Sequence, residues 1–199
     1  MRSFVSEFLG TLFLVATVVG SGIMADNLSM GNHAVALLAN AISTGAILYV
    51  LIIIFSELSG AHFNPVVSLI MFMMKKISLS NFLAYVFFQI MGGVLGAFLA
   101  HFMFEMSIIQ LSTNVRTGSS QYFSEVIAAF GLVLTILLGL KYKRESIATL
   151  VALYITAAYW FTSSTSFANP AVTIARTFTD TFSGIQNSDT VPFIMAQIL

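Results

Sequence analysis

The residue pattern with the clearest chemical meaning in this chain is an Asn-Pro pair that occurs twice, about one hundred residues apart. Asn64 and Pro65 form the first pair, and Asn169 and Pro170 form the second, so two of the 3 prolines belong to this pattern. Asn is a strong helix N-cap and Pro is favoured at the first helical position, so each pair predicts the start of a helix. An Asn side chain also carries N–H donors that bind oxygen atoms of a small solute.

The apolar stretches that follow the two pairs, at about 64–74 and 169–179, are too short to cross a bilayer. Each therefore predicts a half-helix that starts inside the membrane. Non-helical backbone at that depth persists only where it is buried in protein or lines a watery cavity. The positive N-terminal ends of two such half-helices repel cations and protons, while their donors still bind water or hydroxyl oxygens.

The composition indicates an all-α membrane protein. The 199 residues are 58% hydrophobic and only 8% charged, whereas an average globular chain is about one quarter charged. The formal net charge is zero, so no nucleic-acid partner is expected. Cys is absent, and no His set at metal-ligand spacing, phosphate-binding loop or Ser/His/Asp arrangement is present. We therefore expect no catalytic residue, no metal and no cofactor, and hence no enzyme.

The apolar segments predict one transmembrane domain over residues 1–199 with about six crossings. The sixth segment begins well, with Pro192 near its first turn, but stops at Leu199 after about half of a crossing. We expect this helix to be truncated and the natural chain to be longer. The predicted spans are 4–24, 34–56, 82–104, 122–141, 147–165 and 191–199.

The distribution of positive charges predicts how the chain is oriented in the membrane. Most lie on one side of the predicted membrane: Arg2, Lys75, Lys76, Lys141, Lys143 and Arg144. The connections on the other side hold only Arg116 and Arg176. Because cytoplasmic loops carry the excess of Lys and Arg, both termini are expected in the cytoplasm.

The two halves of the chain, about 1–105 and 120–199, share more than the Asn-Pro pairs. Glu7 opens the first span and Glu125 opens the fourth, while Gln89 lies in the third and Gln197 in the sixth. Three spans per repeat is an odd number, so the repeats are inverted and the half-helices meet near the membrane midplane. Secondary transporters are also built on inverted repeats, and one remains the alternative from another functional class.

These features resemble the aquaporin and aquaglyceroporin (major intrinsic protein) family over the whole chain. The resemblance implies a right-handed bundle of six transmembrane helices, here with the sixth truncated, plus two re-entrant half-helices. It also implies passive flow of small neutral solutes through a homotetramer embedded in membrane lipid, in this case the bacterial inner membrane. The matching residues are Ser59 to Phe63, the pore motifs Asn64, Pro65, Val66, Asn169, Pro170 and Ala171, and Glu7, Gln89, Glu125 and Gln197.

The resemblance also places the selectivity filter. Val172 stands where the family usually carries an Arg, and the other constriction positions fall on Thr44, Ala157 and Ser166. None of these is aromatic, charged or large, and Arg176 is not a substitute by spacing. The expected filter is therefore wide and lacks a guanidinium.

A wide, uncharged filter predicts passage of glycerol, urea and neutral arsenous acid as well as water. The segment 154–172 looks like a bacterial subgroup of the family that is associated with arsenic resistance and also carries Val at the Arg position. A non-conducting or truncated family member is the remaining alternative.

Two carboxylates at membrane depth, Glu7 and Glu125, are costly and need a role. The expected role is to support the re-entrant loops by hydrogen bonds, together with His62, Gln89 and Gln197. A proton relay, as a transporter would need, is the alternative. For His62 a structural or pore-lining role is favoured over gating by protonation.

Overall fold

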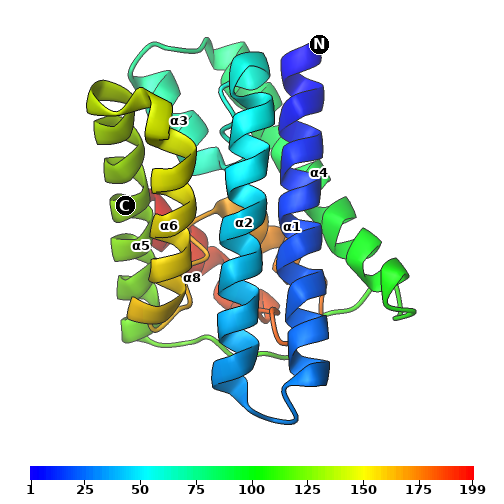
Figure 1. Cartoon of the computed structure of the whole chain (residues 1–199). Coiled ribbons are helices and arrows are strands. Elements are labelled where there is room, and N and C mark those ends of the chain that lie inside the picture. Colours follow the sequence, from blue (N-terminus) through cyan, green and yellow to red (C-terminus); the bar gives the residue numbers. More distant parts are fainter.

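The computed structural model describes residues 1–199 and is helical throughout, as predicted (Figure 1). The connections between the helices contain no strand. The elements are α1 (Arg2–Leu28), α2 (His33–Ser59), α3 (Pro65–Met73), α4 (Leu79–Met103), α5 (Ser119–Tyr142), the short 3₁₀ helix η1 (Arg144–Ser146), α6 (Ile147–Phe161), α7 (Pro170–Arg176) and α8 (Asn187–Ile198).

Four of these helices, α1, α2, α4 and α5, are long and apolar enough to cross a membrane. The fifth predicted span is shorter than expected, because α6 has 15 residues and ends at Phe161 rather than at 165. The sixth predicted span begins earlier than expected. Since α8 starts at Asn187, Pro192 lies inside the helix instead of in its first turn, which corrects the sequence-based boundary.

Helices α1 and α4 pack closely against each other. A Cβ atom added at Gly92 would lie 2.3 Å from the Phe8 carbonyl oxygen, and one at Gly96 would lie 2.3 Å from that of Leu12. Only glycine permits backbones to approach so closely. The helical spacing of Gln89, Gly92 and Gly96 places them on one face of α4, so this contact also brings Gln89 to α1.

The outer surface of the bundle is apolar. Large hydrophobic side chains are exposed along most of the helices, among them Leu38, Ile53, Phe87, Phe130 and Leu153. A soluble protein rarely exposes so much contiguous apolar surface, and a bilayer is the environment that covers it.

Two re-entrant loops enter the bundle from opposite ends. In Figure 1 α2 ends beside the N-terminus, so the loop 60–64 enters from that end, while α6 runs the other way and the loop 162–169 enters from the far end. Each loop leads into one of the half-helices α3 and α7 in the middle of the molecule.

Candidate functional site

Each half-helix begins at its Asn-Pro pair. The Asn64 Oδ1 atom accepts a hydrogen bond of 2.9 Å from the Val66 backbone N–H. The Asn169 Oδ1 atom accepts bonds of 3.0 Å from the Ala171 N–H and 3.4 Å from the Val172 N–H. Asn at the N-cap and Pro at the first helical position therefore start α3 and α7 where the sequence predicts.

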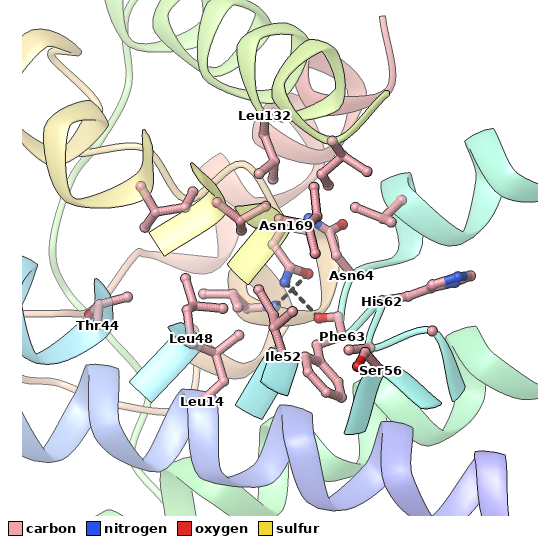
Figure 2. A pocket seen from close by; sticks show the side chains of 18 of the residues that line it. Leu14, Thr44, Leu48, Ile52, Ser56, His62, Phe63, Asn64, Leu132 and Asn169 are labelled. Carbon is pink, nitrogen blue, oxygen red and sulfur yellow. Dashed lines mark hydrogen bonds between the residues drawn. The ribbon is translucent and has the colours of Figure 1, made fainter. Parts of the chain in front are cut away.

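The two Asn side chains also join the two loops to each other. The Asn64 Nδ2 atom donates to the Ala168 carbonyl oxygen at 2.7 Å, and the Asn169 Nδ2 atom donates to that of Phe63 at 2.8 Å. Figure 2 shows the pair side by side in the middle of the site. An Asn amide carries two N–H groups, so each side chain keeps one donor for a solute.

Glu7 of α1 holds the first loop. Its carboxyl oxygens accept bonds from the backbone N–H groups of His62 (3.0 Å) and Phe63 (2.7 Å) and from the Ser59 hydroxyl (2.6 Å). The Gln89 Nε2 atom donates to the same carboxyl group at 2.7 Å. Glu7 is fully buried, so all of its acceptor capacity is directed at protein donors.

Glu125 of α5 holds the second loop in the same manner. Its carboxyl oxygens accept bonds from the backbone N–H groups of Phe167 (2.9 Å) and Ala168 (2.8 Å), and from the Gln197 Nε2 atom at 2.6 Å. The Gln197 amide also donates to the Thr173 hydroxyl at 2.8 Å, which ties α8 to α7. The contacts of Gln89 and Gln197 are thus counterparts of each other.

His62 lies at the cavity edge of the first loop. Its Nδ1 atom is 3.1 Å from the Ser68 hydroxyl, and its ring packs edge-on against Tyr85 at 5.2 Å between centroids. The same Ser68 hydroxyl accepts a bond from Gln89. These contacts link His62 to the Glu7 network.

A cavity of about 620 Å³ runs past both Asn side chains. Figure 2 shows Thr44 at one end and Ser56 and His62 at the other, with Leu48 and Ile52 between them along α2. Of its 28 lining residues 17 are hydrophobic, so polar contacts are confined to a few positions. A mostly apolar wall with a small number of placed polar groups is typical of a site for small neutral molecules.

Three of the four predicted filter residues, Thr44, Ser166 and Val172, line this cavity. The fourth, Ala157, does not: it is exposed on the outer surface of α6. Tyr159 lines the cavity in the place that was expected for Ala157. Its hydroxyl oxygen lies 3.1 Å from the hydroxyl oxygen of Thr44. The position of Ala157 is therefore corrected. Counting back from Asn169 crosses the non-helical loop 162–169, where helical spacing does not hold.

The expectation that no filter residue is aromatic or charged also needs correction, because Tyr159 is aromatic and a cation lies one turn from Val172. Arg176 lines the cavity although only 2% of its surface is exposed, and it lies one helical turn beyond Val172 on α7. The carbon atom at the centre of its guanidinium is 3.4 Å from the centroid of the Phe167 ring, which also lines the cavity. Spacing from Asn169 had set Arg176 aside, but positions four apart on a helix share a face.

Arg116, in the connection between α4 and α5, has a place near the site that the sequence did not indicate. Its guanidinium carbon lies 4.9 Å from the same Phe167 centroid. Its Nε atom donates to the Gly184 carbonyl oxygen at 2.8 Å, and its Nη1 atom to that of Ser164 at 3.3 Å. Desolvation lowers the pKa of Arg116 below its usual value. No periodic pattern marks this connection, so the sequence carried no signal for it.

Comparison with known proteins decides the family. Residues 1–167 match the major intrinsic protein family. The chain belongs to this family. The family is one of membrane channels and not of enzymes, so the predictions of family membership and of a non-enzymatic role are confirmed.

Individual relatives agree with this assignment. The aquaglyceroporin AqpS of Rhizobium meliloti is 55% identical over 198 residues, which cover 100% of this chain and 84% of the relative. An aquaglyceroporin of Toxoplasma gondii is 31% identical over 87% of this chain, which spans 64% of that relative. The X-ray structure of the aquaglyceroporin from Plasmodium falciparum superposes with a TM-score of 0.74 at 22% identity, covering 99% of this chain and 90% of that one. The last comparison shows the fold.

Proposed function

We propose that this protein is a passive channel for small neutral solutes, namely water, glycerol-like polyols, urea and neutral arsenous acid. The observation that carries the proposal is the cavity of about 620 Å³ that passes both Asn side chains with a largely apolar wall. The Asn64 and Asn169 amides offer donors to a passing hydroxyl oxygen, while the half-helix N-termini disfavour cations.

The proposed filter combines three small or medium side chains with one aromatic residue, Tyr159, whose hydroxyl oxygen lies 3.1 Å from that of Thr44. Thr44, Ser166 and Val172 line the cavity without a guanidinium at the Val172 turn. The nearest cation on α7 is one turn further along, at Arg176. A polyol larger than water therefore meets methyl and hydroxyl groups at the Val172 turn, and the charged fork of Arg176 lies one turn further along α7. Membership of a channel family and the relatives named aquaglyceroporins support the same solute class.

Swelling of proteoliposomes tests the proposal. Inward gradients of glycerol and of arsenous acid should drive fast, non-saturating influx, and an impermeant osmolyte measures water flow beside them. Val172→Arg adds bulk and a second cation four residues from Arg176, and we expect it to lower glycerol influx about tenfold or more. Ala157→Val, on the outer surface, is the matched control and should leave influx unchanged. Water flow alone, or influx that saturates at low concentration or requires a proton gradient, contradicts the proposal.

The same proposal includes the assembly and its setting. We propose a homotetramer in the bacterial inner membrane with a cytoplasmic N-terminus, built as a single domain from inverted repeats at about 1–105 and 120–199. The exposed apolar surface and the paired contacts of Glu7 and Glu125 support this arrangement. Native mass spectrometry of the detergent-solubilised protein tests the tetramer, and labelling of Cys residues introduced at Arg2 and at the exposed Val115 tests the orientation.

A further inference from the structure

Arg176 has more hydrogen-bond donors than the protein satisfies. A guanidinium carries five N–H donors in a planar fork. The Arg176 Nε atom donates to the Ser183 carbonyl oxygen, and the two terminal nitrogens have no acceptor in the protein. Arg176 is nevertheless almost fully buried and lines the cavity. Its free donors therefore require a partner that comes from the cavity.

This guanidinium also lacks a counter-ion. Glu125 is the carboxylate whose charge acts on Arg176, and Glu125 and Asp189 both act on Arg116. Glu125 accepts from the two loop N–H groups and from Gln197. Asp189 accepts from the Arg116 backbone N–H at 2.7 Å, the Thr117 hydroxyl at 2.5 Å and Gln186 at 3.0 Å. Neither carboxylate bonds a guanidinium, although a buried charge without a partner is costly.

Arg116 places a second positive charge near that of Arg176. The guanidiniums of Arg116 and Arg176 both contact the Phe167 ring, at 4.9 Å and 3.4 Å from its centroid. The protein acceptors on both are neutral carbonyl groups. Two cations in a low-dielectric site with only neutral acceptors create a positive potential at this end of the cavity.

Ser166 supplies an independent sign of a missing ligand. Its hydroxyl is buried, 3% of the residue is exposed, and the Oγ atom has no hydrogen-bond partner. Ser166 lines the same cavity and directly precedes Phe167, the residue beneath Arg176. A buried polar atom in a native structure is nearly always paired, so an unpaired hydroxyl on a residue of the cavity wall is a second sign of a missing ligand.

We propose that Arg176 and Ser166 form an oxyanion-binding site in the half of the cavity that α7 reaches. The terminal nitrogens of Arg176 match two oxygens of a tetrahedral oxyanion such as phosphate or sulfate, and the Ser166 hydroxyl donates to a third. Because the site lies on the solute path, a bound oxyanion obstructs the passage of neutral solutes. The flux consequence rests on the proposed channel function, whereas the binding does not.

Glycerol influx into proteoliposomes tests the site with inorganic phosphate as the probe. Phosphate is placed at equal concentration on both sides, with chloride substituted at matched ionic strength in the reference. It then adds no osmotic gradient and reaches the site whatever the orientation of the protein. We expect about 10 mM phosphate to slow glycerol influx at least twofold. Phosphate should also raise the unfolding temperature of the detergent-solubilised protein, a readout that does not depend on flux.

Ser166→Ala is the cleanest variant, because the hydroxyl that it removes has no bond within the protein. Ala also tolerates the local backbone, as Ala168 in the same loop has φ 47° beside φ 51° at Ser166. We expect it to weaken the phosphate effect about threefold. Arg176→Gln should abolish the effect, and Arg176→Lys, which keeps the charge but loses the fork, should reduce it. Arg144→Gln is the matched control, since Arg144 lines the opposite end of the cavity and should not alter phosphate sensitivity.

The outcomes separate the two proposals. Glycerol influx that ignores phosphate, or phosphate sensitivity that persists in Ser166→Ala and Arg176→Gln, overturns the oxyanion site. Sensitivity that disappears in Arg144→Gln also overturns it, because the anion then binds at the other end. Absence of glycerol influx contradicts the proposed channel function. The thermal shift with phosphate then still shows whether the protein binds an oxyanion.

Discussion

The two re-entrant loops share one framework and differ in what they present to the cavity. In each, a buried Glu accepts two consecutive backbone N–H groups, of His62 and Phe63 or of Phe167 and Ala168. Each also has non-Gly residues with positive φ one and three positions before the Asn. These are Phe63 (49°) and Ala61 (52°) in the first loop, and Ala168 (47°) and Ser166 (51°) in the second.

The difference lies at positions whose side chains face the cavity. Two residues before the Asn stands His62 in one loop and Phe167 in the other, and seven residues after it stands Met71 or Arg176. The backbone positions are fixed by the carboxylate bonds, because an uncommon left-handed conformation persists only where its surroundings hold it. The side chains at the cavity-facing positions take no part in these bonds and can differ. The two loops therefore share the same carboxylate bonds to the backbone but present chemically different side chains to the cavity.

The largest expected effect comes from breaking the shared support. Glu7→Gln and Glu125→Gln each replace a carboxyl group by an amide that turns an N–H toward at least one loop donor. We expect each to lower the free energy of unfolding by about 3 kcal/mol and to abolish glycerol influx. Thermal unfolding in detergent and liposome swelling measure the two effects.

Glu57→Gln is the control for this pair, because Glu57 is exposed and its replacement should change stability by about 0.5 kcal/mol or less. Similar losses in the two buried variants would sharpen the comparison. A large loss in only one of them would show that the two loops do not depend on their carboxylates equally.

A smaller effect is expected where the loops differ. Phe167→Leu removes the ring beneath Arg176 and its edge-on contact with Phe193 at 5.2 Å between centroids. We expect a loss of about 2 kcal/mol in unfolding free energy. His62→Leu, the same change at the matching position, removes mainly the 3.1 Å contact with Ser68 and should cost about 1 kcal/mol. Urea or thermal unfolding ranks the two, and the reverse order would contradict the assigned contacts.

The smallest effect is expected at the hydroxyls that accept from the two Gln amides. Ser68→Ala and Thr173→Val each remove one acceptor, at 2.9 Å from Gln89 and 2.8 Å from Gln197. Each should cost about 1 kcal/mol in unfolding free energy. The two losses should be similar, because the Ser68 variant also leaves the His62 Nδ1 atom without its partner and the Thr173 variant also removes the 2.9 Å bond to the Asn169 carbonyl oxygen. A neutral Ser68→Ala alongside a costly Thr173→Val would break the parallel between the loops.

Much of the fold followed from the sequence because its signals are local. The Asn-Pro pairs start both half-helices through N-cap bonds that involve residues two or three positions away. Long apolar runs marked the four long helices, and their boundaries agree to within five residues. Both signals depend on neighbours along the chain, which is why single-sequence reasoning finds them.

The wall of the cavity was harder to predict because it depends on paths between helices. The residues between Ala157 and Asn169 include a loop that is not helical, so helical counting misplaces this filter position, which Tyr159 occupies. Arg176 was within reach of sequence reasoning, since it lies four residues beyond Val172 on one helix face. Arg116 was not, because it reaches Phe167 from a connection distant in sequence.

The reciprocal bonds between the loops have a consequence for biosynthesis. The Asn64 amide needs a carbonyl 104 residues later in the chain, and the Phe63 carbonyl needs an amide 106 residues later. While a ribosome is still making the fourth helix, the first loop has no partner for either group. The first half of the protein must therefore wait in the membrane with its loop unsecured, and the two loops are completed together only after the second Asn-Pro pair has been inserted.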